Sequence, residues 1–172
     1  IVFLSMRANL NHQSNNPCSK GVEILSIGTE LLLGNIVNTN AQWISEELSS
    51  LGLNHFRQST VGDNLNRICQ LVKEISSRSN LLITTGGLGP TPDDLTTEAI
   101  AKSFDAQLYG REYLWDDIKK KLFNTSSNFN SASLKKQCFF PKNAQIINNP
   151  RGTAPGMIWT PIKGFTILTF PG

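Results

Sequence analysis

Residues 81–96 read Leu81-Leu82-Ile83-Thr84-Thr85-Gly86-Gly87-Leu88-Gly89-Pro90-Thr91-Pro92-Asp93-Asp94-Leu95-Thr96. The first five residues form an apolar run typical of a buried strand, and the run leads directly into a loop of glycines, prolines and aspartates. Behind the loop, Leu95, Ala99, Ile100 and Phe104 recur at helical spacing. A strand, a glycine-rich turn and a helix in this order form the repeating unit of an α/β fold.

The same alternation precedes this unit. A strand is expected at 22–27 and a helix at 41–51, with Asn38, Thr39 and Asn40 as candidate N-caps. A weaker strand at 53–61 comes before a helix whose predicted apolar face is Leu65, Ile68, Leu71, Val72 and Ile75. This order predicts a mostly parallel sheet with helices on both faces.

The C-terminal part of the chain changes character. We expect a helix over 111–122, a loop over 124–133, and strands at 144–147, 156–160 and 165–170. A turn at 161–164 joins the last two strands, which therefore add to the sheet in antiparallel direction. The predicted fold class is α/β with a mostly parallel sheet and antiparallel C-terminal strands.

Length and composition suit one ordinary domain. Of the 172 residues, 1–20 are polar and rich in Asn and Ser, which predicts a disordered leader, and 21–172 form the expected domain. The chain begins without Met and ends abruptly at Gly172, so we interpret it as a fragment or as a reading frame opened upstream of its true start. Three widely spaced cysteines show no metal-ligand spacing and indicate a reducing, cytoplasmic compartment.

Charge and hydropathy exclude two classes of partner. The net charge of +3 comes from scattered basic residues rather than from one basic face, so we expect no nucleic acid partner. No apolar stretch is long enough to span a bilayer, so we expect no membrane partner either.

The glycine loop is the strongest candidate for chemistry. It follows a buried strand, and ligands of open α/β sheets bind at the carboxyl ends of the strands. Gly86, Gly87 and Gly89 lack a Cβ, so their N–H groups can approach a phosphate closely. The next helix directs its positive N-terminal end to the same place, and Thr85 and Thr91 add hydroxyl donors. We therefore expect this loop to bind the phosphates of a nucleotide.

Two carboxylates in the loop, Asp93 and Asp94, would repel a phosphate unless they serve another purpose. A divalent cation could bridge carboxylate and phosphate oxygens, or an aspartate could cap the helix that begins near Leu95. We expect both, with one aspartate as the cap and the other facing metal or water. A capped turn without a ligand is the simpler alternative. Glu30 is a third carboxylate near the expected metal.

Further candidates follow the first strand. Gly28, Thr29 and Glu30 open on the same edge of the sheet as the glycine loop. Asn38 and Asn40 could read a base or a ribose, and each could equally cap the next helix.

Two more candidates follow later strands. Asp63 lies after the second strand and could reach the edge or cap a helix. Arg151, in a loop with Gly152 and Thr153, could clamp a phosphate bidentately or remain a solvated surface residue. Metal-assisted attack by water on a phosphate needs no protein nucleophile, and none is predicted.

Four motifs together resemble the CinA family, the competence- and damage-inducible proteins of bacteria. They are Gly28-Thr29-Glu30-Leu31-Leu32-Leu33-Gly34 with Asn38-Thr39-Asn40, Val61-Gly62-Asp63-Asn64, Thr85-Gly86-Gly87-Leu88-Gly89-Pro90-Thr91 with Asp93-Asp94-Leu95-Thr96, and Asn149-Pro150-Arg151-Gly152-Thr153-Ala154-Pro155-Gly156. The resemblance covers 22–172 and implies the family's N-terminal domain. That domain has the molybdopterin-binding (MogA/MoaB-like) fold, a three-layer α/β/α sandwich. Full-length members often continue into a domain similar to nicotinamide-mononucleotide amidases, which we expect to be absent here.

The resemblance also implies an activity. It is the hydrolysis of ADP-ribose to AMP and ribose 5-phosphate with a divalent metal (Mg²⁺, Mn²⁺ or Co²⁺), and K⁺ is a further candidate cofactor. Asp94 matches an aspartate that precedes a Leu-Thr pair in the fold family, and Asp63 matches one after the second strand. With Asp93 they are the candidate catalytic residues, and Asp93, Asp94 and Glu30 are the candidate metal ligands.

Two other functions fit the same resemblance. One is a molybdopterin-binding or adenylyl-transfer domain, and the other is a non-catalytic nucleotide sensor that regulates an amidase domain in the parent protein. In all three, the candidate nucleotide- and phosphate-binding residues are Gly28, Thr29, Glu30, Asn38, Asn40, Thr85, Gly86, Gly87, Gly89, Thr91, Arg151, Gly152 and Thr153. The resemblance implies a homodimer or a larger symmetric assembly. Trp43, Trp115 and Trp159 are candidate anchors, but we expect each in the core.

Overall fold

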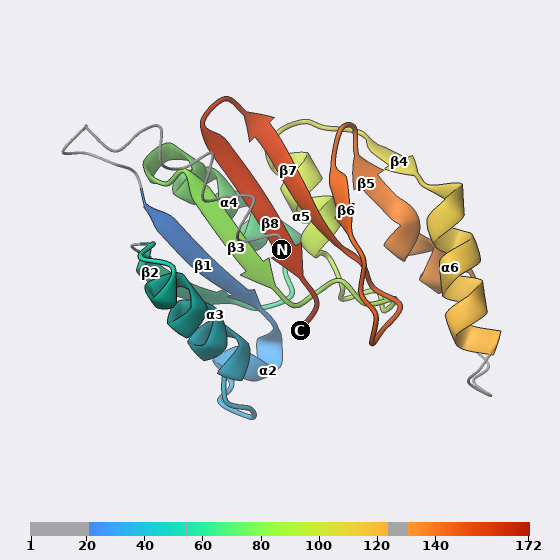
Figure 1. Cartoon of the computed structure of the whole chain (residues 1–172), viewed down its shortest axis with the longest axis horizontal. Coiled ribbons are helices and arrows are strands. Elements are labelled where there is room, and N and C mark those ends of the chain that lie inside the picture. The colour runs from blue at the N-terminus through green and yellow to red at the C-terminus, as the bar shows by residue number, and fades with distance from the viewer. Residues whose placement is uncertain (1–20, 54, 124–130) are drawn as a thin grey trace.

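Six strands form one sheet in the order β2-β1-β3-β8-β7-β6 (Figure 1). The structure, a computed structural model, describes residues 21–53, 55–123 and 131–172, so the expected leader at 1–20 lies outside it. The strands are β1 Val22–Ile27, β2 His55–Val61, β3 Leu81–Thr85, β6 Gln145–Ile147, β7 Gly156–Ile162 and β8 Phe165–Phe170. β1, β2, β3 and β8 are parallel, whereas β7 is antiparallel to both β8 and β6. The predicted sheet, mostly parallel with antiparallel C-terminal strands, is confirmed.

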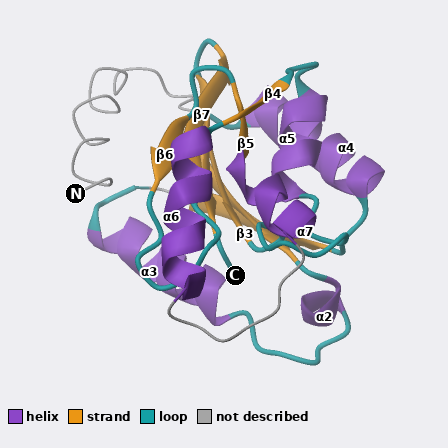
Figure 2. Cartoon of the chain, turned by 90° about the vertical axis from the view of Figure 1, so that its right-hand side faces the viewer, coloured by secondary structure: helices purple, strands orange, loops and turns teal. Residues whose placement is uncertain are grey.

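Helices cover both faces of this sheet and complete the three expected layers (Figure 2). They are α2 Thr29–Leu32, α3 Thr39–Ser50, α4 Leu65–Arg78, α5 Thr96–Ser103, α6 Glu112–Phe123, α7 Ser131–Lys135 and the 3-10 turn η2 Lys136–Cys138. α3 packs on one face, against a core that includes Ile24 and Ile83. α4 and α5 pack on the other face, against a core that includes Leu25 and Leu82. Neighbouring strand residues point to opposite faces, so each buried strand supplies both cores.

The segment after α5 differs most from the prediction. Two strands of three residues, β4 (Leu108–Gly110) and β5 (Phe139–Pro141), pair antiparallel in a separate small sheet. Residues 131–133 were expected in a loop and lie in α7, and the rest of that expected loop, 124–130, lies outside the described residues. The short helix forms because Leu134 is buried in the larger core, a tertiary contact that a local Asn- and Ser-rich composition does not reveal.

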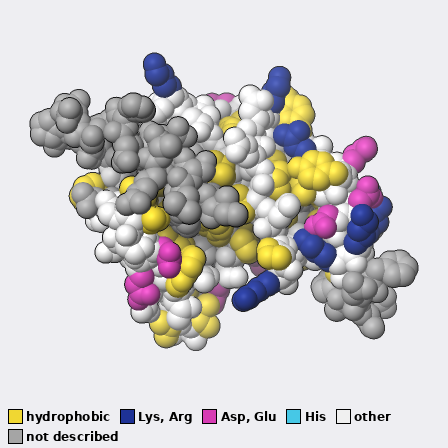
Figure 3. Space-filling view, in the orientation of Figure 1, with side chains coloured by type: hydrophobic (Ala, Val, Ile, Leu, Met, Phe, Trp, Pro, Cys, Tyr) yellow, Lys and Arg dark blue, Asp and Glu magenta, His cyan; other side chains and the backbone are white. Residues whose placement is uncertain are grey.

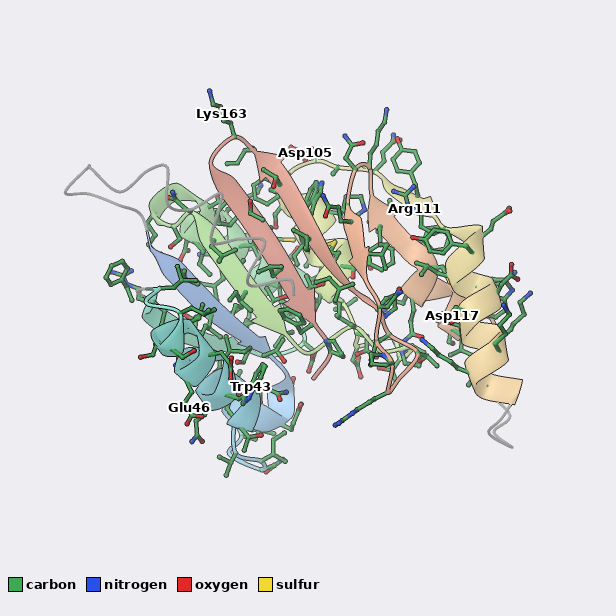
Figure 4. All side chains as sticks on the ribbon, viewed as in Figure 1. Trp43, Glu46, Asp105, Arg111, Asp117 and Lys163 are labelled. Carbon is green, nitrogen blue, oxygen red and sulfur yellow. The ribbon has the colours of Figure 1, made fainter. Side chains whose placement is uncertain are left out.

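The tryptophans differ from one another. Trp159 is buried and meets the ring of Phe104 edge-on, so its expected place in the core is confirmed. Trp115 is half-buried against the same core. The expectation is wrong for Trp43, which is 56% exposed (Figure 4). α3 buries the side that carries Ala41, Ile44 and Leu48, and Trp43 lies off that side.

None of the helices that the structure describes combines the length and the apolar character that a bilayer crossing requires.

A buried ion pair stabilises the end of the sheet away from the glycine loop. Glu23 is 3% exposed and accepts hydrogen bonds from Arg78 Nε (2.7 Å), Arg78 Nη2 (2.8 Å) and Ser79 Oγ (2.5 Å). Burial raises the pKa of Glu23, but the hydrogen bonds from Arg78 and Ser79 and the nearby charges of Arg78 and Arg57 outweigh it, so the pKa lies below its usual 4.5. The carboxylate therefore contributes stability above that pH and loses it as the pH falls further.

Replacing Glu23 by glutamine is expected to lower the free energy of unfolding by about 2 kcal/mol at pH 7, because hydrogen bonds to a charged acceptor are lost. The difference from the wild type should shrink only as the pH falls below 4.5 and through the lowered pKa of the wild-type carboxylate, where Glu23 takes up a proton. Urea unfolding at several pH values measures this. Glu46→Gln, on the exposed side of α3 (Figure 4), is the control. It should change neither the free energy of unfolding at pH 7 nor the dependence of that free energy on pH.

Candidate active site

The loops that follow the parallel strands meet at one edge of the sheet, where they form a cleft of about 770 Å³. The order of the strands puts the loop after β1 between the loops after β2 and β3, and the C-terminal residues after β8 lie beyond β3 (Figure 1). The cleft is lined by Ile27, Gly28, Glu30, Leu31, Ile36, Val37, Asn38, Thr39, Asn40, Asp63, Thr85, Gly86, Gly87, Leu88, Gly89, Thr91, Asp93, Asp94, Ala154, Pro171 and Gly172. Most of the predicted site residues are therefore brought together, although they come from distant parts of the sequence.

The glycine loop takes a shape that requires glycine at its start. Gly86 and Gly87 have φ angles of 96° and 64°, in the left-handed region. A Cβ on Gly86 would lie 2.1 Å from the carbonyl oxygen of Ile27, so the loop passes directly against the end of β1. The N–H of Gly86 donates to Phe170 O (3.1 Å) and is not available to a ligand.

The next N–H groups of the loop remain available. Within the part of the chain that the structure describes, the backbone N–H groups of Gly87, Leu88 and Gly89 donate to no protein acceptor. Thr96 fixes the loop from behind, because its hydroxyl donates to Gly86 O (2.8 Å) and its N–H to Gly87 O (3.1 Å). The loop is thus held in place while three consecutive donors stay free, which suits an anion such as a phosphate.

Asp94 is ordered by its own turn rather than by the following helix. Its Oδ2 accepts from Thr91 N (2.8 Å) and Thr91 Oγ1 (2.6 Å), which leaves Oδ1 for another partner. α5 has Leu95 at its N-cap and no side-chain cap, so the expected capping by an aspartate is wrong. Thr96 takes the role of anchoring the start of the helix, as its hydroxyl binds a loop carbonyl. Asp93 is exposed beside the cleft.

Asp63 joins the loops after β1 and β2. Its Oδ2 accepts from Thr29 N (2.8 Å) and Thr29 Oγ1 (2.9 Å), and its own N–H donates back to Thr29 Oγ1 (3.1 Å). The alternative in which Asp63 caps the next helix is wrong, because Asn64 is the N-cap of α4. Glu30 is exposed in the cleft, and its carboxylate packs so closely on Gly28 that a Cβ there would lie 2.5 Å from Oε1.

The two asparagines have different roles. Asn38 caps α3 by accepting from Ala41 N (3.1 Å), and its amide group donates to Ser26 Oγ (2.8 Å), so the capping alternative is confirmed for this residue. Asn40 caps no helix. Its Nδ2 donates a hydrogen bond to Thr85 Oγ1 (3.4 Å), and both residues line the cleft.

The loop that carries Arg151 stands apart from the other candidates. Asn149 shapes it, because its Oδ1 accepts from the N–H groups of Arg151 (3.0 Å) and Gly152 (3.1 Å). Arg151 is exposed, and neither it nor Gly152 nor Thr153 lines the cleft. Ala154, the next residue, does.

The cleft is strongly acidic. Among the described residues, its lining includes the carboxylates of Glu30, Asp63, Asp93 and Asp94 and no Lys or Arg side chain. Among the residues that the structure describes, no three His, Cys, Asp or Glu side chains are grouped so as to hold a metal by themselves. Mg²⁺ is commonly held by one or two carboxylates together with substrate phosphates and water, and Oδ1 of Asp94 with the neighbouring exposed carboxylates suits this mode.

Two residues behind the loop were not predicted from the sequence. Lys136 Nζ donates to Thr91 O (3.0 Å), and Gln137 Nε2 donates to Leu88 O (3.2 Å), so η2 supports the glycine loop at two points. Both residues line a second pocket of about 150 Å³ that shares Gly87, Gly89 and Asp94 with the main cleft. Their role depends on tertiary contacts across 45 and 49 residues, for which the local sequence carries no signal.

Comparison with known proteins agrees with this geometry. Residues 23–172 match the family described as "Probable molybdopterin binding domain". A solved CinA protein of unknown function from Thermoplasma acidophilum is 34% identical, with a TM-score of 0.80 over 90% of this chain and 89% of that one. The chain belongs to the CinA family. A CinA-like protein of Prochlorococcus marinus is 83% identical over 97% of this chain, which spans only 39% of that protein.

More distant structures share the fold alone. MoaB from Thermus thermophilus, a molybdopterin biosynthesis enzyme, is 21% identical, with a TM-score of 0.54 over 88% of this chain and 80% of that one. The chain therefore has a MogA/MoaB-like fold, as the resemblance of its sequence motifs implied.

Proposed function

We propose that this domain binds a nucleoside diphosphate sugar and hydrolyses ADP-ribose to AMP and ribose 5-phosphate with a divalent metal. The observation that carries the proposal is the juxtaposition of three free backbone N–H donors, at Gly87, Leu88 and Gly89, with an acidic cleft whose described lining residues include no Lys or Arg. Free N–H donors suit phosphate oxygens, whereas the carboxylates alone would repel them. A cation between carboxylates and diphosphate resolves this conflict.

Each residue has a part in this reaction. Asp94 would hold the metal through Oδ1, with Glu30 or Asp93 as the second carboxylate, and the N–H groups of Gly87 and Gly89 would bind the diphosphate. The metal would supply a more acidic water and neutralise charge on the phosphates. One water is consumed: its oxygen bonds to phosphorus as the bridging P–O bond breaks, and the protons leave with the two phosphate products and solvent. Asp63 would position the loop after β1 through Thr29.

Incubation of the chain with ADP-ribose and Mg²⁺, Mn²⁺ or Co²⁺, followed by chromatography, tests the proposal. We expect AMP and ribose 5-phosphate in equal amounts, no turnover with EDTA, and an effect of added K⁺ if that ion is a second cofactor. Nucleotide binding without turnover in any metal would instead favour the nucleotide sensor.

A molybdopterin-binding or adenylyl-transfer domain is the second candidate. The family description and the fold shared with MoaB favour it. It predicts tight binding of molybdopterin and none of ADP-ribose, which a fluorescence titration of the pterin distinguishes.

The setting of this activity is part of the proposal. The curated relatives are more than twice as long as this chain, so regulation of an amidase domain would belong to the parent protein. We propose a cytoplasmic homodimer that works on a small nucleotide. Lys119 and Lys121 of α6 pair with Asp116 and Asp117, which supports the absence of a nucleic acid partner, and we propose no membrane partner. Light scattering of the purified chain measures the oligomeric state.

A further inference from the structure

The segment between β1 and α3 exposes an unusual number of large apolar side chains. Leu32, Leu33, Ile36 and Val37 are 53%, 70%, 53% and 80% exposed, and yellow atoms mark this region at the lower left of Figure 3. Exposed apolar groups that gather beside a polar cleft usually mark a binding surface. Only some of them belong to the cleft: Ile36 and Val37 line it, whereas Leu32 and Leu33 do not.

Three apolar residues of this segment, Leu31, Ile36 and Val37, line the cleft and are called the apolar wall below. The sheet fixes where this wall lies relative to the glycine loop. β1 and β3 are neighbours, so the loop after β1 lies directly beside the loop after β3, about 4.8 Å away at the level of the strands. Ile36, Val37 and the half-buried Leu31 therefore line the same cleft as Gly87, Leu88 and Gly89, whose N–H groups are free, and they lie on its β1 side. β8 is the neighbour of β3 on the other side, and the described lining beyond it consists of Ala154, which is buried, Pro171 and Gly172.

We infer that the wall formed by Leu31, Ile36 and Val37 is the subsite for the nucleobase of the bound nucleotide. A planar heterocycle buries both of its faces when it binds, and aliphatic side chains can pack against one of these faces. With the phosphates at Gly87–Gly89, the base lies over the β1 side of the cleft and the second sugar extends towards Ala154. This assignment rests on the proposed nucleotide binding and adds the direction in which the nucleotide lies.

AMP and ribose 5-phosphate provide the test, because both carry a phosphorylated ribose and only AMP carries a base. The full chain, Val37→Ser and Leu33→Ser are titrated with each compound by calorimetry in the presence of Mg²⁺. Leu33 is the matched control, since it is exposed in the same segment but lies outside the cleft. Both side chains are at least 70% exposed, so neither change should disturb folding, and melting curves verify this.

The wild type should bind AMP more tightly than ribose 5-phosphate. Val37→Ser should weaken AMP binding about tenfold, the amount expected for losing most of the burial of one valine side chain, and leave ribose 5-phosphate unchanged. Leu33→Ser should change neither. The inference is overturned if Val37→Ser leaves AMP binding intact, or if Leu33→Ser weakens it equally.

The same titrations separate this inference from the proposed reaction. If the wild type binds AMP through Val37 but does not hydrolyse ADP-ribose, the base subsite stands and the proposed hydrolysis fails. If it binds neither AMP nor ribose 5-phosphate, the inferred base subsite is wrong, and the incubation with ADP-ribose and metal decides the proposed hydrolysis independently.

Discussion

Asp94→Asn is expected to reduce AMP formation from ADP-ribose at least about a hundredfold, the scale of loss for one metal or proton-transfer group. Asparagine has the same shape and can still accept a hydrogen bond from Thr91, so the turn should persist. It lacks the negative charge that Oδ1 of Asp94 would offer to a cation. The loss should therefore appear in the rate and in metal affinity, with little change in melting temperature.

Asp105→Asn is the control for this variant. Asp105 is exposed just after the end of α5, it does not line the cleft, and its φ of 51° suits asparagine. Asp105→Asn should form AMP from ADP-ribose at the rate of the wild type. If Asp94→Asn retains full activity, Asp94 is a structural residue of the turn and the proposed role is wrong.

Gly86→Ala should produce the largest loss of stability, roughly 3 kcal/mol or more, from left-handed strain together with a steric clash. The new Cβ would lie 2.1 Å from Ile27 O, a backbone atom that cannot rotate away. The end of β1 and the start of the glycine loop would have to separate, and the hydrogen bond from Gly86 N to Phe170 O would be strained. Urea unfolding of the purified variant measures the loss.

Gly34→Ala isolates the conformational part of this effect. Gly34 also has a positive φ, 73°, but a Cβ there would meet nothing within 4 Å. Gly34→Ala should therefore lower the free energy of unfolding by about 1 kcal/mol. If Gly86→Ala is no less stable than Gly34→Ala, the close approach of the loop to β1 is not a constraint on the fold.

The sequence predicted those parts of the molecule that local patterns determine. The apolar runs at 22–27 and 81–85 are buried strands, and the rule that parallel strands end at one edge correctly placed Gly28, Asp63 and Gly86 in one cleft. The three-residue strands β4 and β5 are too short to show a period, and they form through pairing across 30 residues or so of chain.

The roles of individual polar residues were harder to predict. Asp63, Asp94 and Asn38 all belong to residue types that cap helices, and only Asn38 does so. Asp63 accepts a hydrogen bond from Thr29, which lies 34 residues away in the sequence. Asp94 accepts one from Thr91, because the prolines and glycines of the loop form a turn before α5 begins. For Arg151 the sequence left two alternatives open, a phosphate clamp and a solvated surface residue, and its side chain is exposed and does not line the cleft.

In the proposed function, the N–H groups after β3 bind the phosphates of a nucleotide. The most direct measurement is an NMR titration of the ¹⁵N-labelled chain with ADP-ribose and Mg²⁺, which follows every backbone amide. The largest shifts are expected at Gly87, Leu88 and Gly89, with smaller ones at Asp94 and Val37. Shifts confined to other parts of the molecule, or none at these glycines under saturating ligand, would contradict the account.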